Sequence, residues 1–245
     1  HWLHRSENTG HQSIVNYLDA SGVMDGPKEG HHDHFVSNLA IEKLEELHQA
    51  DQPWSLVASY WGPHHAYFPT APFADTVDPE SIPEHPTFND DLTTRPFRHF
   101  SHLNSNNSGR ADWPDWSSWQ KILARAYEQQ KQTDDAVGEL LHALEQSGQA
   151  DNTLVIWVCD HGDTVASHGG VWGKYATYTE EVARIPFAVR WPNGFSGGEA
   201  RSEIVSNMDV TATMLEAAGV HIPEQMSSRS VLPLCNHSDD NWPEA

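Results

Sequence analysis

The chain has 245 residues, with 14 Lys and Arg against 35 Asp and Glu, which gives a formal net charge of −21. Such an acidic protein repels phosphate backbones, so the composition argues against nucleic-acid binding. The longest apolar run, residues 154–159, is far shorter than the roughly 18 residues that a membrane span needs. Two cysteines cannot form the framework of a small disulfide scaffold, and the length suits one domain with its own core.

Residues 1–32 are rich in Gly, His, Asn and Ser and show no period, which predicts a loop. We expect His31, His32 and His34 to be solvated rather than to bind a metal. Asp33 then resembles the N-cap of a helix that ends between residues 49 and 53. Its predicted apolar face consists of Phe35, Leu39, Leu44 and Leu47.

The next segments alternate between strand, loop and helix. Residues 54–61 predict a strand buried on both faces, which leads directly into a polar turn at 62–65. Residues 66–112 predict a long surface loop, and residues 116–147 a helix that stops at Gly148. The apolar stripe expected along that helix is Ile122, Leu123, Ala126, Val137, Leu140, Leu141 and Leu144.

The rest of the chain predicts strands at 152–159 and 185–191 and a helix at 208–218. This order indicates an α/β protein with a mainly parallel central sheet flanked by helices. Ligands of such sheets bind beyond the carboxyl ends of the strands. Two segments satisfy that condition, namely the turns at 62–65 and 160–163.

Asp160 and His161 follow the second of the predicted strands, where the chain turns and both side chains can face one cation. A carboxylate oxygen and a neutral imidazole nitrogen suit a divalent metal. Lys174 lies in a glycine-containing stretch and suits an anionic oxygen of a substrate. His64, in the other turn, could protonate a departing oxygen, and His168 could line the same pocket. The alternative for each residue is an ordinary turn or surface position, and the context favours the chemical role for Asp160, His161 and Lys174.

These segments together resemble the sulfatase family of the alkaline-phosphatase-like superfamily. The similarity lies in residues 53–88, in the helix with Tyr127, Asp134 and Gly138, in residues 151–194 with their Asp-His-Gly and Gly-Lys motifs, and in residues 205–220. It covers about residues 33–235. The resemblance implies an alkaline-phosphatase-like fold, incomplete at the N-terminus, with residues 1–220 as the C-terminal part of the catalytic domain. Residues 221–245 would be a tail or the start of a C-terminal subdomain.

The resemblance also implies roles for the candidate residues. Asp160 and His161 would bind a divalent metal, most often calcium, with manganese or magnesium as alternatives. Lys174 would hold a sulfate oxygen, and His64 would contact the sulfate ester and protonate the leaving alcohol, with His168 nearby. The nucleophile of the family is a formylglycine, made from Cys or Ser in a C/S-x-P-x-R motif. No cysteine or serine of this sequence stands in that motif, so we expect these 245 residues to be inactive alone.

Two alternatives stay open at this stage. A phosphodiesterase or phosphonate monoester hydrolase of the same superfamily would use the same residues, and a truncated remnant would use none of them. The expected substrate is a small-molecule or carbohydrate sulfate ester, with Arg95, Arg98, Arg110, Trp113 and Trp116 as possible contacts. Oligomeric state and localisation cannot be read from the sequence.

Overall fold

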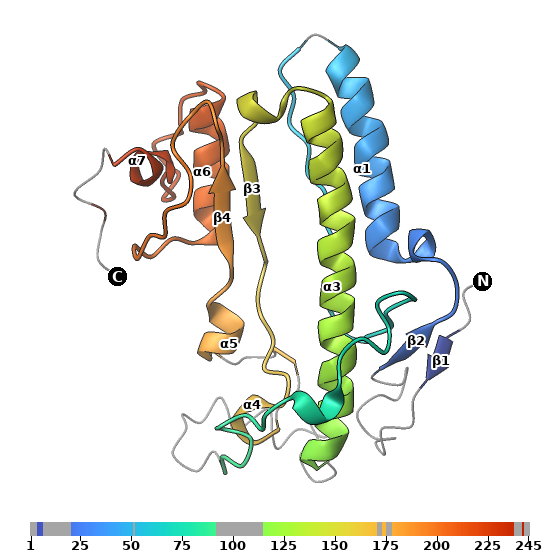
Figure 1. The fold of residues 1–245 in the computed structure, drawn as a ribbon. Coiled ribbons are helices and arrows are strands. Elements are labelled where there is room, and N and C mark those ends of the chain that lie inside the picture. Colours follow the sequence, from blue (N-terminus) through green and yellow to red (C-terminus); the bar gives the residue numbers. More distant parts are fainter. Residues whose placement is uncertain are drawn as a thin grey trace. The chain divides into compact units, whose positions relative to one another are not determined.

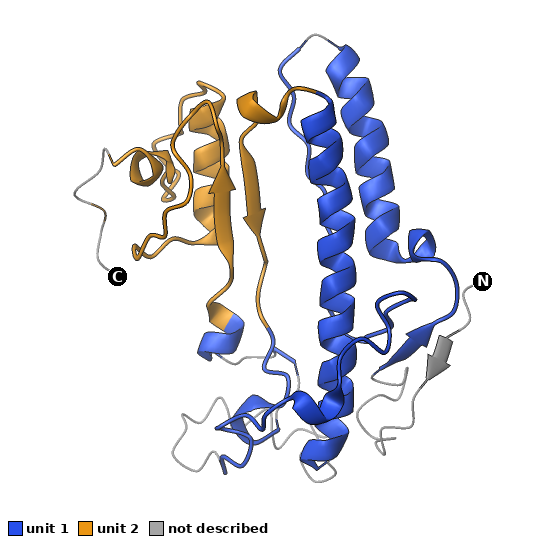
Figure 2. Cartoon of the chain, viewed as in Figure 1, with its two compact units in different colours: residues 1–147, 163–182 blue, residues 148–162, 183–245 orange. Residues whose placement is uncertain are grey.

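The computed structural model describes residues 4–6, 21–50, 52–91, 115–170, 173–174, 178–237 and 242. Two compact units divide the chain (Figure 2). Unit 1 consists of residues 1–147 and 163–182, and unit 2 of residues 148–162 and 183–245. None of the described helices is long and apolar enough to cross a membrane.

Helices α1 (His32–Gln49) and α3 (Trp116–Gln146) pack side by side in unit 1 (Figure 1). The predicted helix at 33–49 is confirmed, but its N-cap is His31 and not Asp33, because the His31 ring accepts a hydrogen bond from the Asp33 amide. The cap of α3 is Asp115, whose carboxylate accepts from the Ser118 amide. Both helices therefore begin at a side-chain cap.

The buried face of α1 matches the predicted one at Leu44, which is buried, but differs from it at the start of the helix. Phe35 and Leu39 are exposed, whereas Asp33, His34 and Ser37 are buried. The reason is the partner, because α3 presents polar groups to this face. Thr133 donates to Asp33 (2.7 Å), Ser37 donates to the Ala136 carbonyl (2.5 Å), and the rings and carboxylates of His34 and Glu139 meet at 3.1 Å. Hydrogen bonding, rather than apolar contact, decides which face points inward.

The apolar part of unit 1 lies along the first turns of α3. Trp119 and Ile122 are fully buried against Tyr67 and Ala166. The predicted stripe is confirmed at Ile122, Leu123 and Leu144, but the middle of the helix buries polar side chains instead. These are Arg125, Glu128, Gln129, Gln132 and Thr133.

The buried polar side chains of α3 hold the loop that follows residue 61. Gln129 accepts from the Phe68 amide (2.7 Å), and Gln132 accepts from the Thr70 amide (2.9 Å). Glu128 accepts from the amides of Thr76 and Val77 (2.8 and 3.0 Å). The described part of the predicted surface loop, up to residue 91, contains only the short helix η2 (Pro79–Ser81). The side of α3 thus binds the amides of this backbone, while the amides of Gly22 and Met24 donate to the carbonyls of Tyr67 and Pro69 (2.9 and 3.1 Å).

The structure contradicts the buried strand predicted at 54–61. No strand is formed there, and the side chains alternate between exposed and half-buried. Val57 is 78% exposed and Trp61 63% exposed. The physical reason is that a strand needs a ladder, and no described segment pairs with this one.

The prediction of an irregular segment at 1–32 is also wrong in part. Strands β1 (His4–Ser6) and β2 (Gly22–Met24) pair antiparallel, and η1 (Lys28–Gly30) precedes α1. The Lys28 ammonium lies 2.5 Å from Asp135 and 2.7 Å from Glu139 on α3. Two further short helices of unit 1 follow residue 163, namely α4 (Ser167–Gly170) and most of α5 (Glu180–Ala183).

Unit 2 contains the second strand pair. Strands β3 (Val155–Val158) and β4 (Phe187–Arg190) confirm two predicted strands, and α6 (Asn207–Ala217) confirms the predicted helix. The remaining elements are η4 (Ala150–Asn152) and α7 (Leu232–Cys235). β3 and β4 are antiparallel, with Val155 opposite Arg190. The α/β class is therefore confirmed, whereas the parallel central sheet is not present among the described residues.

Candidate functional site

His64 and Lys174 meet in unit 1, although 110 positions separate them in sequence. The Lys174 Nζ atom lies 2.6 Å from Nε2 of His64. The other ring nitrogen of His64 lies 2.5 Å from the His65 carbonyl, which favours a proton on Nδ1 and a lone pair on Nε2. Both side chains are part-buried, so an anion that replaced their mutual contact would meet a cation and a ring nitrogen together.

The charge state of His64 follows from these neighbours. Burial lowers the pKa of His64, the hydrogen bond to the His65 carbonyl partly offsets this, and the positive charge of Lys174 adds to the lowering. His64 is therefore neutral at neutral pH when no anion is bound. A bound anion would counteract the charge of Lys174 and favour a proton on the ring.

The turn that carries His64 is fixed from both helices. Gln129 of α3 donates to the His64 carbonyl (3.2 Å), and the Gly62 amide donates to Asp33 of α1 (3.1 Å). A Cβ atom on Gly62 would lie 2.2 Å from an Asp33 oxygen and 2.4 Å from the Thr133 hydroxyl, so only glycine fits. The same buried polar contacts that organise unit 1 thus position one candidate residue.

Asp163 connects this turn to the segment that carries Lys174. Its Oδ2 lies 3.8 Å from the ring of His65, and its Oδ1 accepts from the amides of Val165 and Gly173 (both 3.1 Å). Burial opposes ionisation of this carboxyl, but His65 and the two amides outweigh burial and lower the pKa of Asp163. The carboxylate is charged and is held in place on both sides.

His168 pairs with an acid rather than with His64. Its Nε2 atom lies 3.0 Å from Glu181, and its amide donates to the Thr87 hydroxyl (3.0 Å). Burial opposes the ionisation of Glu181, yet hydrogen bonds from its own amide and from His168 lower the pKa of Glu181. The predicted substrate contact of His168 stays a prediction.

A cavity of about 560 Å³ lies beside this group in unit 1. Pro63, Asp163, Ser167 and Glu181 contribute to its wall, so it adjoins the turns of His64 and His168. The remaining lining residues are Tyr67, His85, Pro86, Thr87, Leu123, Ala126, Tyr127, Gln130, Thr164 and Val165. Its volume falls in the range typical of small-molecule pockets.

The loop residues predicted as substrate contacts have mixed outcomes. Trp116 packs edge-on against Phe88 and His85, with ring centroids 5.1 and 5.3 Å away, and these contacts account for its position. Arg95, Arg98, Arg110 and Trp113 lie outside the described residues.

Asp160 and His161 follow β3 in unit 2. Nδ1 of His161 lies 2.9 Å from the Gly162 carbonyl, which favours a proton on Nδ1 and leaves the Nε2 lone pair available. Asp160 uses Oδ1 to accept from the His161 amide, and its Oδ2 lies 3.4 Å from Nε2 of His161. That separation suits two ligands of one ion, and the Asp160 side chain is 86% exposed. The pair fits the donor set expected of a divalent-metal site.

Asn207 supports the same turn, and sequence reasoning missed it. Its side-chain amide, at the start of α6, donates to the carbonyls of Cys159 and Asp160 (3.1 and 3.2 Å). Burial raises the pKa of the Cys159 thiol, and the nearby Asp160 adds to this. Cys159 is therefore a protonated thiol, as expected of a residue that is not a nucleophile.

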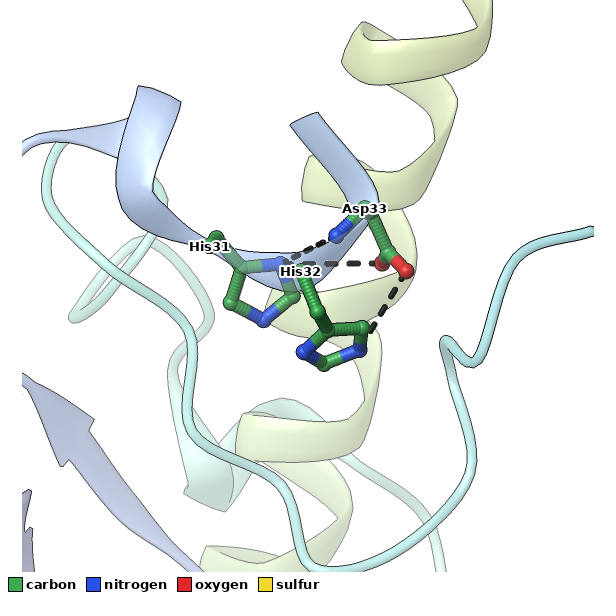
Figure 3. A group of neighbouring side chains, drawn as sticks. All are labelled: His31, His32 and Asp33. Carbon is green, nitrogen blue, oxygen red and sulfur yellow. Dashed lines mark hydrogen bonds and ion pairs between the residues drawn. The ribbon is translucent and has the colours of Figure 1, made fainter. Parts of the chain in front are cut away.

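Two further groups of side chains in unit 1 have the composition of metal ligands. In the first, His31 and His32 turn toward the carboxylate of Asp33, at 3.7 and 3.2 Å (Figure 3). The second contains His34, Asp135 and Glu139, where the Lys28 ammonium already provides the positive charge. His31 and His34 are buried, so the expectation that they are solvated is wrong.

Comparison with known proteins identifies the family. The family model described as Sulfatase matches residues 2–220. The chain belongs to the sulfatase family. Among its relatives, the sulfatase YidJ of Escherichia coli is 26% identical over 210 residues, which is 81% of this chain and 38% of that protein. The extracellular sulfatase SULF-1 homolog of Drosophila melanogaster is 32% identical over 128 residues, 51% of this chain and 11% of that protein.

Solved structures share the fold of this chain. The phosphonate monoester hydrolase of Silicibacter pomeroyi has a TM-score of 0.77 at 23% identity, over 98% of this chain and 47% of that one. A structure of BT4656 in complex with D-glucosamine-2-N,6-O-disulfate has a TM-score of 0.72 at 20% identity, over 91% of this chain and 56% of that one. The chain spans less than two thirds of the length of all these relatives.

Proposed function

We propose that this chain contributes to the hydrolysis of sulfate monoesters, and that Lys174 and His64 act at the ester. The supporting observation is the 2.6 Å contact between their nitrogens, which converge on one point from distant segments. The Lys174 ammonium would hold a sulfate oxygen, and His64 would donate a proton to the departing alcohol oxygen. His168 would contribute at the rim of the same cavity.

The lowered pKa of His64 supports a role of this residue in proton transfer. Burial and Lys174 lower that pKa in the free protein, so the ring starts neutral. A sulfate ester carries one negative charge, which would offset Lys174 and raise the proton affinity of His64 Nε2. The ring would then carry a proton where the leaving oxygen develops charge.

Asp160 and His161 would bind the divalent metal of the site, which we propose to be calcium, with manganese or magnesium as alternatives. The separation of 3.4 Å between Oδ2 of Asp160 and Nε2 of His161 supports this assignment. A divalent ion would neutralise charge on the ester oxygens and on the nucleophile. Two protein ligands do not complete the coordination of such an ion, so further ligands come from outside the pair.

We further propose that a formylglycine nucleophile is supplied outside these 245 residues. The motif from which it is made does not occur in the sequence. Relatives with more than twice the matched length support this view. In the whole protein, the exposed apolar run at 54–61 would pair within a mainly parallel sheet. Residues 1–220 would belong to the catalytic domain, with 221–245 as a tail or the start of a C-terminal subdomain.

For the alcohol part of the substrate we propose a sulfated sugar. The cavity next to the His64 turn offers the aromatic ring of Tyr127 together with the polar groups of His85 and Gln130. This mixture of aromatic faces and hydrogen-bonding groups suits a carbohydrate. BT4656, a structural neighbour, binds a sulfated glucosamine.

A phosphonate monoester or phosphodiester is the second candidate substrate, because two phosphonate monoester hydrolases share the fold. The test uses the complete natural protein that contains this chain, with aryl sulfate, aryl phosphonate and aryl phosphodiester substrates. We expect the highest kcat/KM on aryl sulfate, and a loss of about 100-fold or more in His64→Asn and Lys174→Met.

The matched controls are His48→Asn and Lys43→Met, which change exposed residues of α1 and should leave the rate unchanged. Preference for the phosphonate substrate would replace the sulfatase assignment by the second candidate. A complete, correctly folded protein that hydrolyses none of the three aryl substrates would support the remaining alternative, an inactive remnant.

A further inference from the structure

Both backbone polar groups of Gly173, its amide and its carbonyl, are held by the segment that follows the candidate metal turn. Asp163 Oδ1 accepts a hydrogen bond from the Gly173 amide (3.1 Å). The Thr164 hydroxyl donates to the Gly173 carbonyl (2.6 Å), and the Thr164 amide lies 3.3 Å from the same oxygen. Thr164 is buried, so these bonds form away from water, where they are strongest.

The Gly173 carbonyl belongs to the peptide plane that continues into Lys174. Because that plane is rigid, fixing the carbonyl also fixes the orientation of the Lys174 backbone nitrogen. Gly173 itself has a φ of +84°. Glycine adopts positive and negative φ about equally readily, so its own conformational preference does not determine this geometry. The backbone that leads into Lys174 is thus held by hydrogen bonds with Asp163 and Thr164.

We infer that Thr164, with Asp163, is a positioning residue that holds Lys174 against His64. The inference rests on the proposed function only for the role of Lys174 toward sulfate. A lysine side chain is long and loses considerable rotamer freedom when its ammonium is held at one place. A backbone already fixed at residue 173 adds no backbone cost to this loss, so only side-chain freedom is given up when the pair at 2.6 Å forms.

The test needs a measurement that reports the Lys174 contact directly. The pKa of His64 does this, because Lys174 is one of the groups that lower it. NMR titration of 13C-labelled histidines, with His64→Asn to assign the resonance, measures it in the complete protein and in the 245-residue chain. Lys174→Met should raise the pKa of His64, and Thr164→Val should shift it in the same direction.

A double-mutant cycle separates positioning from a general structural role. In the Lys174→Met background, Thr164→Val should cause no further shift in the pKa of His64, because its effect passes through Lys174. Thr164→Ser, which retains the hydroxyl, should keep the wild-type value. Thr213→Val removes a buried hydroxyl of unit 2 that donates to the Asp209 carbonyl, and this control should also leave the pKa unchanged.

A wild-type pKa of His64 in a folded Thr164→Val variant, together with a raised pKa in Lys174→Met, would overturn the inference. The binding of inorganic sulfate to the complete protein gives a second measurement. Lys174→Met should weaken it by about tenfold or more, and Thr164→Val by a smaller factor. Since the NMR titration needs no turnover, it can support Thr164 even if the proposed sulfatase activity is absent.

Discussion

The two units hold their candidate residues by different means. In unit 1, fully buried Glu128, Gln129 and Gln132 of α3 bind the backbone of the loop after residue 61. In unit 2, Asp160 and His161 lie on an exposed turn after a short strand pair whose apolar side chains are only partly buried. Unit 1 thus uses buried hydrogen bonds to hold the loop of its candidate residue in place, whereas unit 2 leaves two metal-ligand atoms accessible.

This contrast indicates where substitutions are costly. Removing one buried polar partner in unit 1 leaves the other without compensation, and such groups cost far more free energy than an exposed apolar side chain. In unit 2, the buried polar contacts concentrate at the start of α6. We expect the sizes of the effects below to follow this distribution.

The largest effect is expected at Arg125, which is buried beside Glu128. Arg125 lies 2.6 Å from Glu128, and its other terminal nitrogen lies 2.8 Å from Asp75. Arg125→Met leaves a buried carboxylate without its partner and should lower the free energy of unfolding by roughly 3–5 kcal/mol. Urea unfolding followed by circular dichroism measures this change.

Two further variants test the cause of that loss. Adding Glu128→Gln to Arg125→Met removes the uncompensated charge but keeps an acceptor for Thr76 and Val77, so it should recover part of the stability. The matched substitution in unit 2 is Arg190→Met at an exposed position of β4, which we expect to change stability by less than about 0.5 kcal/mol. Equal losses in the two units would remove the contrast.

A pH dependence of stability is expected from His31. Burial lowers the pKa of His31 to about 4, and the charge of His32 adds to this. Between pH 4 and 6.5 the unfolded chain binds a proton that the folded chain does not, so stability rises with pH over this window. The contribution is present in full above pH 6.5, is lost as the pH falls toward 4, and amounts to about 3 kcal/mol.

The control for this titration is His31→Asn. Asparagine is a good N-cap, so it can replace the bond that the His31 ring accepts from the Asp33 amide. The variant should fold and should show a smaller slope of unfolding free energy against pH between 4 and 6.5. An unchanged slope would assign the pH dependence to other groups.

Gly62→Ala tests the packing of the His64 turn against α1 and α3. The added methyl group would overlap the carboxylate of Asp33 and the hydroxyl of Thr133, so we expect a loss of roughly 1–3 kcal/mol. Gly138→Ala is the matched control, because its Cβ would meet no atom within 4 Å and alanine favours the helix. Thermal unfolding should therefore show opposite signs for the two variants.

The next effect belongs to unit 2, at the start of α6. Asp209 accepts from the amides of Ser206 (2.8 Å) and Arg229 (2.9 Å) and so joins the helix cap to a later segment. Asp209→Ala should lower the free energy of unfolding by about 1–2 kcal/mol. Glu216→Ala, at an exposed position of the same helix, should be nearly neutral when measured in the same way.

The sequence predicts the longer described helices α1, α3 and α6 because local signals determine them. Asp115, Gly148 and the apolar residues of the first turns mark α3 without reference to any other segment. The family is predicted from motifs and is confirmed. The roles of His64 and Lys174 stay predictions, and their side chains lie in contact.

The buried polar network could not be predicted in the same way. Gln129 and Glu128 look like ordinary surface residues of a helix, because their partners are backbone amides that carry no sequence signal. The same applies to Thr164 and Asn207, which bind carbonyl groups of the turns. The strand predicted at 54–61 is wrong for a related reason. The apolar pattern of this run indicates a tendency to pair, but it does not determine which segment would pair with it.

The smallest effect is expected at Val57, and it tests directly whether residues 54–61 form the predicted strand. Val57 is 78% exposed, so Val57→Thr should change the stability of the 245-residue chain by less than about 0.5 kcal/mol. If the run 54–61 pairs within a central sheet of the complete protein, as we propose, the same substitution there buries a hydroxyl and should cost about 1–3 kcal/mol. Thermal unfolding of both forms measures the difference, with the exposed Glu45→Gln as a control that should be neutral in each.

A small effect in both forms would mean that Val57 is exposed in the complete protein as well, and a large effect in both would mean that the chain already buries it.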